Sequence, residues 1–149
     1  MILIAHRGNV NGSFPSYENE PNYIDLAIKK EFEVEIDVWM KDEMLFLGHD
    51  SPMYGVDFRW FRDRISRLWI HCKNIDSLLF FRSNNYNFNY FWHQEDDFTL
   101  TSHGYIWTYP GKPLTEKSIA VMPELKIHEE TSSKCYGICT DFPSRYIDK

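Results

Sequence analysis

The hydrophobic pattern of the chain predicts eight short β-strands. Each is a short, mainly apolar run bounded by polar or turn-forming residues, as expected of strands that are buried in a sheet. They cover residues 2–5, 34–38, 44–47, 68–72, 89–92, 105–107, 119–122 and 136–139. A tight turn at residues 41–43 joins the second predicted strand to the third.

Three segments between these strands predict helices. Apolar residues at helical spacing follow Pro21, which suits a first helical turn because its missing N–H needs no partner there. Residues 58–65 and 76–83 are the other two segments. Strands in series with helices between several of them predict an α/β fold. The expected architecture is a (β/α)8 TIM barrel, formed by residues 1–149 as one domain.

The length of the chain requires this barrel to be a reduced one. A complete barrel of this kind has about 250 residues, and even minimal strands, helices and loops add up to about 175. The chain has only 149. We therefore expect three or four genuine helices, with several outer helices missing or shortened after Asn89. An open α/β sheet with fewer parallel strands is the alternative architecture.

Composition and charge argue against several classes of protein. The chain is 43% hydrophobic and 26% charged, which is typical of a globular domain. Its net charge of -6 lacks the basic excess of a nucleic-acid-binding protein. No apolar run is long enough to span a membrane, and residues 1–5 are too short for a signal peptide. Three cysteines without metal-type spacing indicate reduced thiols and a cytoplasmic protein.

The predicted strand at residues 34–38 places two carboxylates on one face. Side chains two positions apart in a strand share a face, so Glu35 and Asp37 point together, and the three aliphatic residues between and beside them point to the other face. If the aliphatic face is the core under the helices, both carboxylates lie inside the barrel. A divalent cation with oxygen ligands, such as Mg²⁺ or Ca²⁺, would relieve their repulsion and lost hydration. The alternative is a surface strand whose acidic residues face water.

Two histidines follow predicted strands, at the ends where barrels carry their active sites. His6 and Arg7 follow the first strand, and His49 follows the third. A pair of histidines can supply the general acid and the general base of phosphodiester cleavage, and an arginine can hold an anion. Each of these residues taken alone also fits an ordinary solvated loop.

The fourth predicted strand ends with another polar pair. His71 and Lys73 share a face, again because they are two positions apart. An inward lysine requires an anion, which is either a substrate phosphate or one of the two carboxylates of the second strand. His71 is a candidate for a metal ligand or for a substrate contact.

Together these runs resemble the signature of the glycerophosphodiester phosphodiesterases, a family of the phosphatidylinositol-phospholipase-C-like phosphodiesterase superfamily. The similar segments are residues 4–8 (IAHRG), 18–19 (EN), 34–38 (VEIDV) and 47–50 (LGHD), and residues 137–143 (GICTDFP) resemble the family's closing strand. The resemblance implies a TIM barrel. The family's catalytic histidines, phosphate-contacting residues and metal ligands correspond to His6 and His49, to Arg7 and Lys73, and to Glu35 and Asp37, respectively.

The chain also departs from the family pattern. The family usually has a glutamate two positions before the lysine as a third metal ligand, and this chain has His71 there. An imidazole nitrogen would shift preference from Ca²⁺ toward a metal that accepts nitrogen. By strand parity with Met122, Glu124 is the candidate replacement ligand. Trp107, at a strand end, is the candidate wall against which a substrate group would stack.

These observations lead to three expectations about function. The first is a metal-dependent phosphodiester hydrolase that acts on small, glycerophosphodiester-like substrates. The second is a reduced barrel that binds phosphorylated ligands without turnover. The third concerns association: if missing helices leave apolar strand faces uncovered, a homo-oligomer could cover them.

Overall fold

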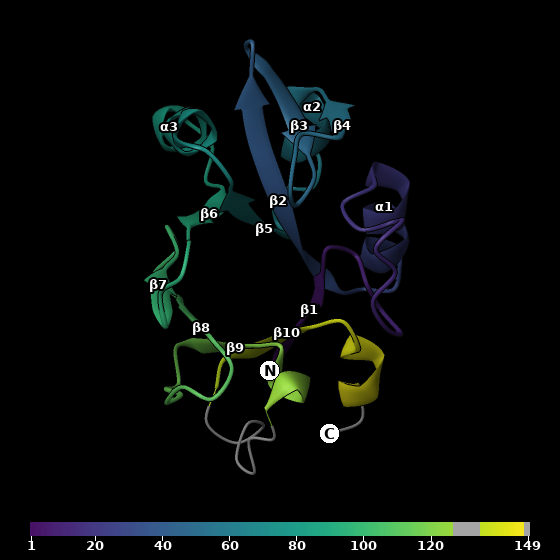
Figure 1. Cartoon of the computed structure of the whole chain (residues 1–149), viewed down its shortest axis with the longest axis vertical. Helices are drawn as coiled ribbons and strands as arrows, with labels where there is room; N and C mark the ends of the chain where they lie inside the picture. The colour runs from purple at the N-terminus through teal and green to yellow at the C-terminus, as the bar shows by residue number, and fades with distance from the viewer. Residues whose placement is uncertain (127–134, 148–149) are drawn as a thin grey trace.

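Ten strands form one curled, mixed sheet in the computed structural model, which describes residues 1–126 and 135–147 (Figure 1). The strands are β1 (Ile2–His6), β2 (Glu33–Lys41), β3 (Met44–Leu47), β4 (Tyr54–Val56), β5 (Leu68–Cys72), β6 (Asn89–Trp92), β7 (Phe98–Leu100), β8 (Ile106–Thr108), β9 (Ser118–Val121) and β10 (Gly137–Thr140). The helices are α1 (Pro21–Lys29), α2 (Phe58–Arg62) and α3 (Ile75–Ser83), with 3₁₀ turns η1 (Pro123–Leu125) and η2 (Pro143–Tyr146).

The sheet is parallel through its centre and antiparallel at its branches. Parallel ladders join β6, β5, β2, β1, β10, β9 and β8 in that order. Antiparallel ladders add β3 to β2, β4 to β3 and β7 to β8. Among the described strands no ladder joins β6 to β7 or β8. Isolated hydrogen bonds connect β6 to this part of the chain instead, such as the one from the Ser102 N–H to the Tyr90 carbonyl oxygen (2.8 Å).

The prediction of a (β/α)8 barrel is therefore wrong. The described part of the chain contains only three α-helices, so helices alternate with few of the strands. In Figure 1 these helices lie outside β1, β2, β5 and β6, while β7 to β10 are linked without any α-helix among the described residues. The expected number of helices is confirmed. The alternative of an open sheet is nearer to the structure, although the sheet is mixed.

The segment at residues 44–47 shows why the barrel prediction failed. Its hydrophobic pattern predicts a strand of the barrel, but β3 pairs antiparallel with β2. Asp42 and Glu43 form a two-residue turn with φ values of 50° and 62°. A turn this short can only join antiparallel neighbours, since a parallel connection requires a crossover of a dozen residues or more. The predicted tight turn was thus itself incompatible with a third parallel strand.

Two apolar clusters lie on opposite faces of the sheet. The outer cluster lies between the helices and β2 and β5, and Val34, Ile36 and Val38 are fully buried in it. The inner cluster, which includes Trp69 and Trp107, fills part of the concave side. The expected alternation along β2 is confirmed, because its aliphatic side chains pack under the helices and its two inner carboxylates are buried on the concave side.

Local sequence signals explain where the helices begin. The Glu20 carboxylate accepts the N–H of Tyr23, with Pro21 in the first turn of α1. Asn74 and Ser77 form a reciprocal capping box at the start of α3. These caps fix the helices directly after the loops that follow β1 and β5, so the polar residues at those strand ends are held by ordered connections.

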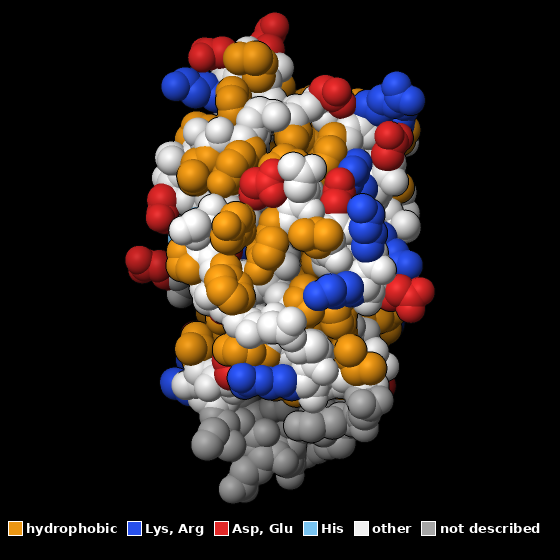
Figure 2. Space-filling view, turned by 90° about the vertical axis from the view of Figure 1, so that its right-hand side faces the viewer, with side chains coloured by type: hydrophobic (Ala, Val, Ile, Leu, Met, Phe, Trp, Pro, Cys, Tyr) orange, Lys and Arg blue, Asp and Glu red, His pale blue; other side chains and the backbone are white. Residues whose placement is uncertain are grey.

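The expected uncovered strand faces are not found in β9 and β10. All residues of these strands are buried on both faces. Exposed apolar side chains lie instead on the side of α1, where Figure 2 shows hydrophobic groups gathered next to a row of cationic ones. Phe14, Tyr17 and Leu26 are each more than half exposed there. A homo-oligomer stays a prediction. None of the described helices has the length and hydropathy needed to cross a bilayer.

Replacing Ile70 by alanine should destabilise the fold strongly. Ile70 is fully buried in the outer cluster, and removing such a side chain leaves a cavity that costs about 2–5 kcal/mol. Leu79→Ala on α3 is the control, since Leu79 is 52% exposed. Urea denaturation measures both variants. Equal stability of the two would contradict the assignment of this face of β5 to the core.

Candidate functional site

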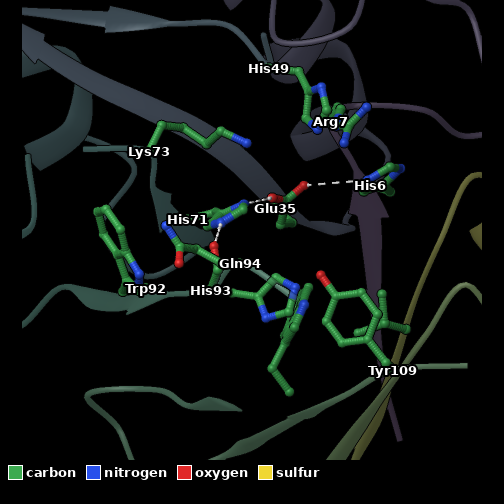
Figure 3. Close-up of a pocket in the computed structure, with 12 residues that line it drawn as sticks. His6, Arg7, Glu35, His49, His71, Lys73, Trp92, His93, Gln94 and Tyr109 are labelled. Atoms are coloured by element: carbon green, nitrogen blue, oxygen red, sulfur yellow. Dashed lines mark hydrogen bonds and ion pairs between the residues drawn. The ribbon is translucent and has the colours of Figure 1, made fainter. Parts of the chain in front are cut away.

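The carboxyl ends of β1, β2, β5, β6 and β8 surround a polar pocket of about 310 Å³ (Figure 3). The His49 loop, which follows β3, adds to its rim. The lining residues are His6, Arg7, Glu35, His49, His71, Lys73, Trp92, His93, Gln94, Trp107, Tyr109 and Val121. Seven of the nine residues proposed from the sequence line this pocket, which Asp37 adjoins through its contacts with Arg7, His71 and Lys73.

Glu35, Asp37 and His71 form a candidate metal site. One ligand atom of each lies within 4.8 Å of the others. Glu35 is 3% exposed and Asp37 is fully buried. Glu35 Oε2 and Asp37 Oδ1 are buried without a well-formed hydrogen bond. Because buried carboxylate oxygens normally have a partner, Glu35 Oε2 indicates a missing cationic group, whereas Asp37 Oδ1 already lies 3.5 Å from Lys73 Nζ.

The orientation of the His71 ring supports this interpretation. His71 Nε2 lies 3.2 Å from the His93 carbonyl oxygen, which can only accept a hydrogen bond. In the neutral ring Nε2 therefore carries the proton, and Nδ1 has the free lone pair. Nδ1 faces Asp37 Oδ1 at 3.0 Å and Glu35 Oε1 at 3.8 Å. A carbonyl that fixes the tautomer of an imidazole in this way is a usual partner of metal-binding histidines.

The two carboxylates have opposite electrostatic tendencies. Burial raises the pKa of Glu35, and the charge of Asp37 raises it further. Burial would also raise the pKa of Asp37, but a hydrogen bond from His71, formed when Nδ1 carries a proton, and the charges of Arg7 and Lys73 together hold it far below its usual value. Asp37 is therefore the permanent anion of the pair, and Glu35 is the group that most needs an additional positive charge.

The loop after β1 holds Asp37 in place. Arg7 Nε lies 3.0 Å from Asp37 Oδ2, and the Asn19 amide both donates to Oδ2 and accepts the Asp37 N–H at 2.9 Å. Arg7 also reaches Glu18 at 3.1 Å. Arg7 and Asn19 both have positive φ values, 52° and 64°. Such strained backbone persists where the surroundings fix it, and it commonly marks functional sites.

His6 is oriented by a carboxylate at the end of β10. Its Nδ1 lies 2.8 Å from Asp141 Oδ1, which also accepts from the Asn9 amide at 2.8 Å. His6 Nε2 faces Glu35 Oε2 at 4.0 Å. Burial alone would lower the pKa of His6, but the hydrogen bond to Asp141 and the charge of Glu35 raise it overall. His6 therefore tends to be protonated, with its Nε2 proton directed into the site.

His49 has the opposite tendency. Its Nδ1 lies 2.7 Å from the exposed Asp50 carboxylate, so Nδ1 donates and Nε2 is left with the lone pair. Burial and the charge of Arg7 lower the pKa of His49. Figure 3 shows the ring beside Arg7. The site thus contains one histidine biased toward the cation and one biased toward the neutral base.

The wall of the pocket at the ends of β6 and β8 is lined by uncharged residues. Trp92, His93, Gln94 and Tyr109 form this wall, and the His93 and Tyr109 rings stack with centroids 4.1 Å apart. Burial, followed by the charge of the neighbouring imidazole, lowers the pKa of His93 to about 4, so its ring is neutral. Trp107 is only 3% exposed and packs on Phe91 and Trp69, so most of it belongs to the inner cluster.

The structure does not place Glu124 with the candidate metal ligands. Its Oε1 accepts hydrogen bonds from the Thr140 hydroxyl (2.7 Å) and the Asp141 N–H (3.2 Å), at the end of β10. The sequence argument extended strand parity to this position, but β9 ends at Val121. Met122 then turns into the left-handed region with φ 45° and begins the 3₁₀ turn η1. Glu124 therefore holds the strand end that carries the partner of His6.

Sequence reasoning missed several residues that this site uses. Asn9 and Asn19, both fully buried, donate to Asp141 and Asp37, respectively. Asn19 lies in the segment of residues 18–19 that carries the resemblance, but neither the resemblance nor the loop position predicts these contacts. Asp141 lies in the segment that resembles the family's closing strand, but nothing in the sequence predicts its contact with His6. Tyr109 lies beyond the predicted strand at residues 105–107 and directly after β8, so strand parity does not extend to it.

Comparison with models of protein families, with curated proteins and with solved structures finds no match of any of the three kinds.

The ion pair between His6 and Asp141 should stabilise the fold most between about pH 4 and 6.5. The raised pKa of His6 gives stability that is lost as the pH rises through it, and the lowered pKa of Asp141 gives stability that is lost as the pH falls through it. A double-mutant cycle with His6→Ala and Asp141→Asn, measured with a chelator present, should give a coupling of about 1–3 kcal/mol at pH 5. A coupling that is larger at pH 9 would contradict the assignment.

Proposed function

We propose that the protein is a metal-dependent phosphodiester hydrolase that acts on small, glycerophosphodiester-like substrates. The observation that carries this proposal is the convergence of three groups in one pocket. These are two histidines with opposite pKa shifts, a carboxylate pair with an imidazole, and two cations. Phosphodiester cleavage requires all three functions: proton transfer in both directions, charge neutralisation, and binding of an anionic phosphoryl group.

The donor set suits a divalent ion. Glu35, Asp37 and His71 offer two carboxylates and one imidazole, with two buried oxygens that have no well-formed hydrogen bond. An ion bound there would polarise the phosphoryl oxygens of the substrate. Mg²⁺ and Ca²⁺ fit the carboxylates, and the imidazole favours a metal such as Mn²⁺ that also accepts nitrogen.

Arg7 and Lys73 supply positive charge for the phosphoryl group. Both side chains lie between Asp37 and the pocket: Lys73 Nζ is 3.5 Å from Asp37 Oδ1, and Arg7 Nε is 3.0 Å from Oδ2. Charge-assisted hydrogen bonds of this kind can be shared between a fixed carboxylate and a bound phosphate. The contact of Lys73 with Asp37, expected as an alternative to phosphate binding, is thus compatible with it.

The histidines take distinct roles in the proposed reaction. His49 Nε2 accepts the proton of the attacking hydroxyl, which belongs to water or to a neighbouring hydroxyl of the substrate. His6 Nε2 gives its proton to the oxygen of the leaving alcohol as the P–O bond breaks. Attack by water yields a monoester and an alcohol, and attack by a substrate hydroxyl yields a cyclic phosphate and an alcohol. Two groups whose surroundings move their pKa values apart are suited to this division.

Phosphate binding without turnover is the second candidate function. The ion pairs of Asp37 with Arg7 and Lys73 already compensate one carboxylate, and a protonated His71 could bridge both. In that case the cluster needs no metal ion, and the pocket binds phosphorylated ligands only. Metal dependence separates the two candidates.

A cytoplasmic location belongs to the same proposal. Cys72 and Cys139 are buried thiols, and burial raises the pKa of Cys72 to about 12 and that of Cys139 well above its usual value. Thiols of this kind remain reduced and unreactive in a reducing compartment.

Chelation should abolish hydrolysis, and added divalent ions should restore it. The substrates are a glycerophosphodiester and bis(para-nitrophenyl) phosphate, tested with Mg²⁺, Ca²⁺ and Mn²⁺. Glu35→Gln should weaken metal affinity by about 10-fold or more, because it removes a charged ligand. Asp42→Asn, in the exposed β2–β3 turn, is the control. Full activity in chelator would refute the metal-dependent mechanism, and ligand binding without turnover would favour the second candidate.

Variants of the two histidines should respond differently to the leaving group. His49→Ala should lower kcat/KM by about 100-fold or more for both substrates, since each needs the base. His6→Ala should be as severe for the glycerophosphodiester but much milder for the para-nitrophenyl ester, whose leaving group departs without a proton. His103→Ala is the control, because His103 is exposed and bonds only to Asn87 among the described residues. The reverse pattern would exchange the two roles, and full activity of either alanine variant would refute the mechanism.

A further inference from the structure

We infer that the Tyr109 hydroxyl contacts the phosphoryl group of the ligand as a neutral hydrogen-bond donor. This inference rests on the proposed function for the identity of the ligand, and it adds a residue from the uncharged wall to the machinery. The other groups assigned to phosphate or to proton transfer come from the end of β1, the residues directly after β1 and β5, and the loop after β3.

The position of Tyr109 is fixed by its backbone and by its ring. It directly follows β8, and its N–H donates to the Asp97 carbonyl oxygen at 3.1 Å. The ring stacks on His93 with an interplanar angle of 25°. Figure 3 shows the phenol oxygen pointing across the pocket toward Glu35 and His6. The side chain is therefore held with its polar end aimed at the centre of the site.

The Tyr109 hydroxyl has no hydrogen-bond partner among the described residues, although it faces a polar pocket. In Figure 3 it points toward Glu35, whose Oε2 is buried and also has no well-formed hydrogen bond. Behind it, His93 is 8% exposed and its Nδ1 is likewise buried without a partner. Polar groups that remain unpaired around one space indicate that a ligand completes their hydrogen bonds.

The protonation state of Tyr109 suits a hydrogen-bond donor. Burial raises the pKa of Tyr109, and the negative charge of Glu35 raises it further. The phenol therefore keeps its proton at any pH at which the two histidines work. A neutral O–H directed at a phosphoryl oxygen can stabilise the charge that develops there, without adding a cation that would compete with a bound metal ion.

The test compares Tyr109→Phe with the wild-type protein and with Tyr105→Phe. Phenylalanine keeps the stacked ring and removes only the hydroxyl. Tyr105 lies four positions earlier and packs on Trp69 and Tyr136, outside the pocket, so its variant controls for the loss of a phenol in the same region. Two quantities are measured for each protein: the affinity for inorganic phosphate by calorimetry, and kcat/KM for the glycerophosphodiester. Thermal unfolding verifies that all three are folded.

Tyr109→Phe should bind inorganic phosphate about 10-fold more weakly and should lose about 10- to 100-fold in kcat/KM, because it lacks one donor to a charged group. Tyr105→Phe should match the wild type in both. If Tyr109→Phe binds phosphate as tightly as the wild type, the inference is refuted. If the wild-type protein binds phosphate but hydrolyses no diester, the proposed hydrolase fails, whereas a weaker affinity in Tyr109→Phe would still support this contact.

Discussion

The burial of two carboxylates on the concave side of β2 is the constraint on which the rest of the site depends. Glu35 and Asp37 point inward because the aliphatic residues between them pack outward under the helices. Two neighbouring buried carboxylates repel each other and have lost their hydration, so the surrounding structure must compensate them. Each charged group on this side of the pocket can be understood as part of that compensation, or as a group oriented by it.

The charges of the two carboxylates are compensated unequally, and this difference gives the site its chemistry. Asp37 is in contact with Arg7, Asn19, His71 and Lys73, and its pKa is held far below its usual value. Among the described residues Glu35 has ion-pair contacts with two imidazoles, at 3.8 and 4.0 Å, and although the charge of Arg7 also acts on it, burial and Asp37 raise its pKa overall. A bound divalent ion would supply the charge that Glu35 lacks. The same residual negative charge helps to keep His6 protonated, as a general acid requires.

The sequence predicted the charged half of the site better than it predicted the fold. Strand periodicity at residues 34–38 and polar residues after strand ends are local signals, and they identified the pocket residues from His6 to Lys73. The barrel depended on how strands pair, which local patterns do not encode: residues 44–47 have the hydrophobicity of a barrel strand, yet their two-residue turn makes them a hairpin. The prediction for Glu124 was wrong for a similar reason, because the alternation of side chains between two faces holds only while the strand continues. Asn19 belongs to the segment of residues 18–19 that carries the resemblance, but its role could not be predicted, because that role depends on a contact with Asp37, 18 positions away.

The α-helices cover the strands that carry the candidate metal ligands. The charge-bearing strands β2 and β5 are covered by an outer apolar cluster that involves α1, α2 and α3, and this packing fixes the backbone from which the ionic groups project. Groups that exchange protons with a substrate require such rigid support, because small displacements weaken ionic contacts and hydrogen bonds. The β8 side of the pocket contributes aromatic and uncharged residues, whose stacking is less sensitive to position, and there hairpins and loops replace α-helices among the described residues. A sheet with only three described helices can therefore still hold an ordered ionic site.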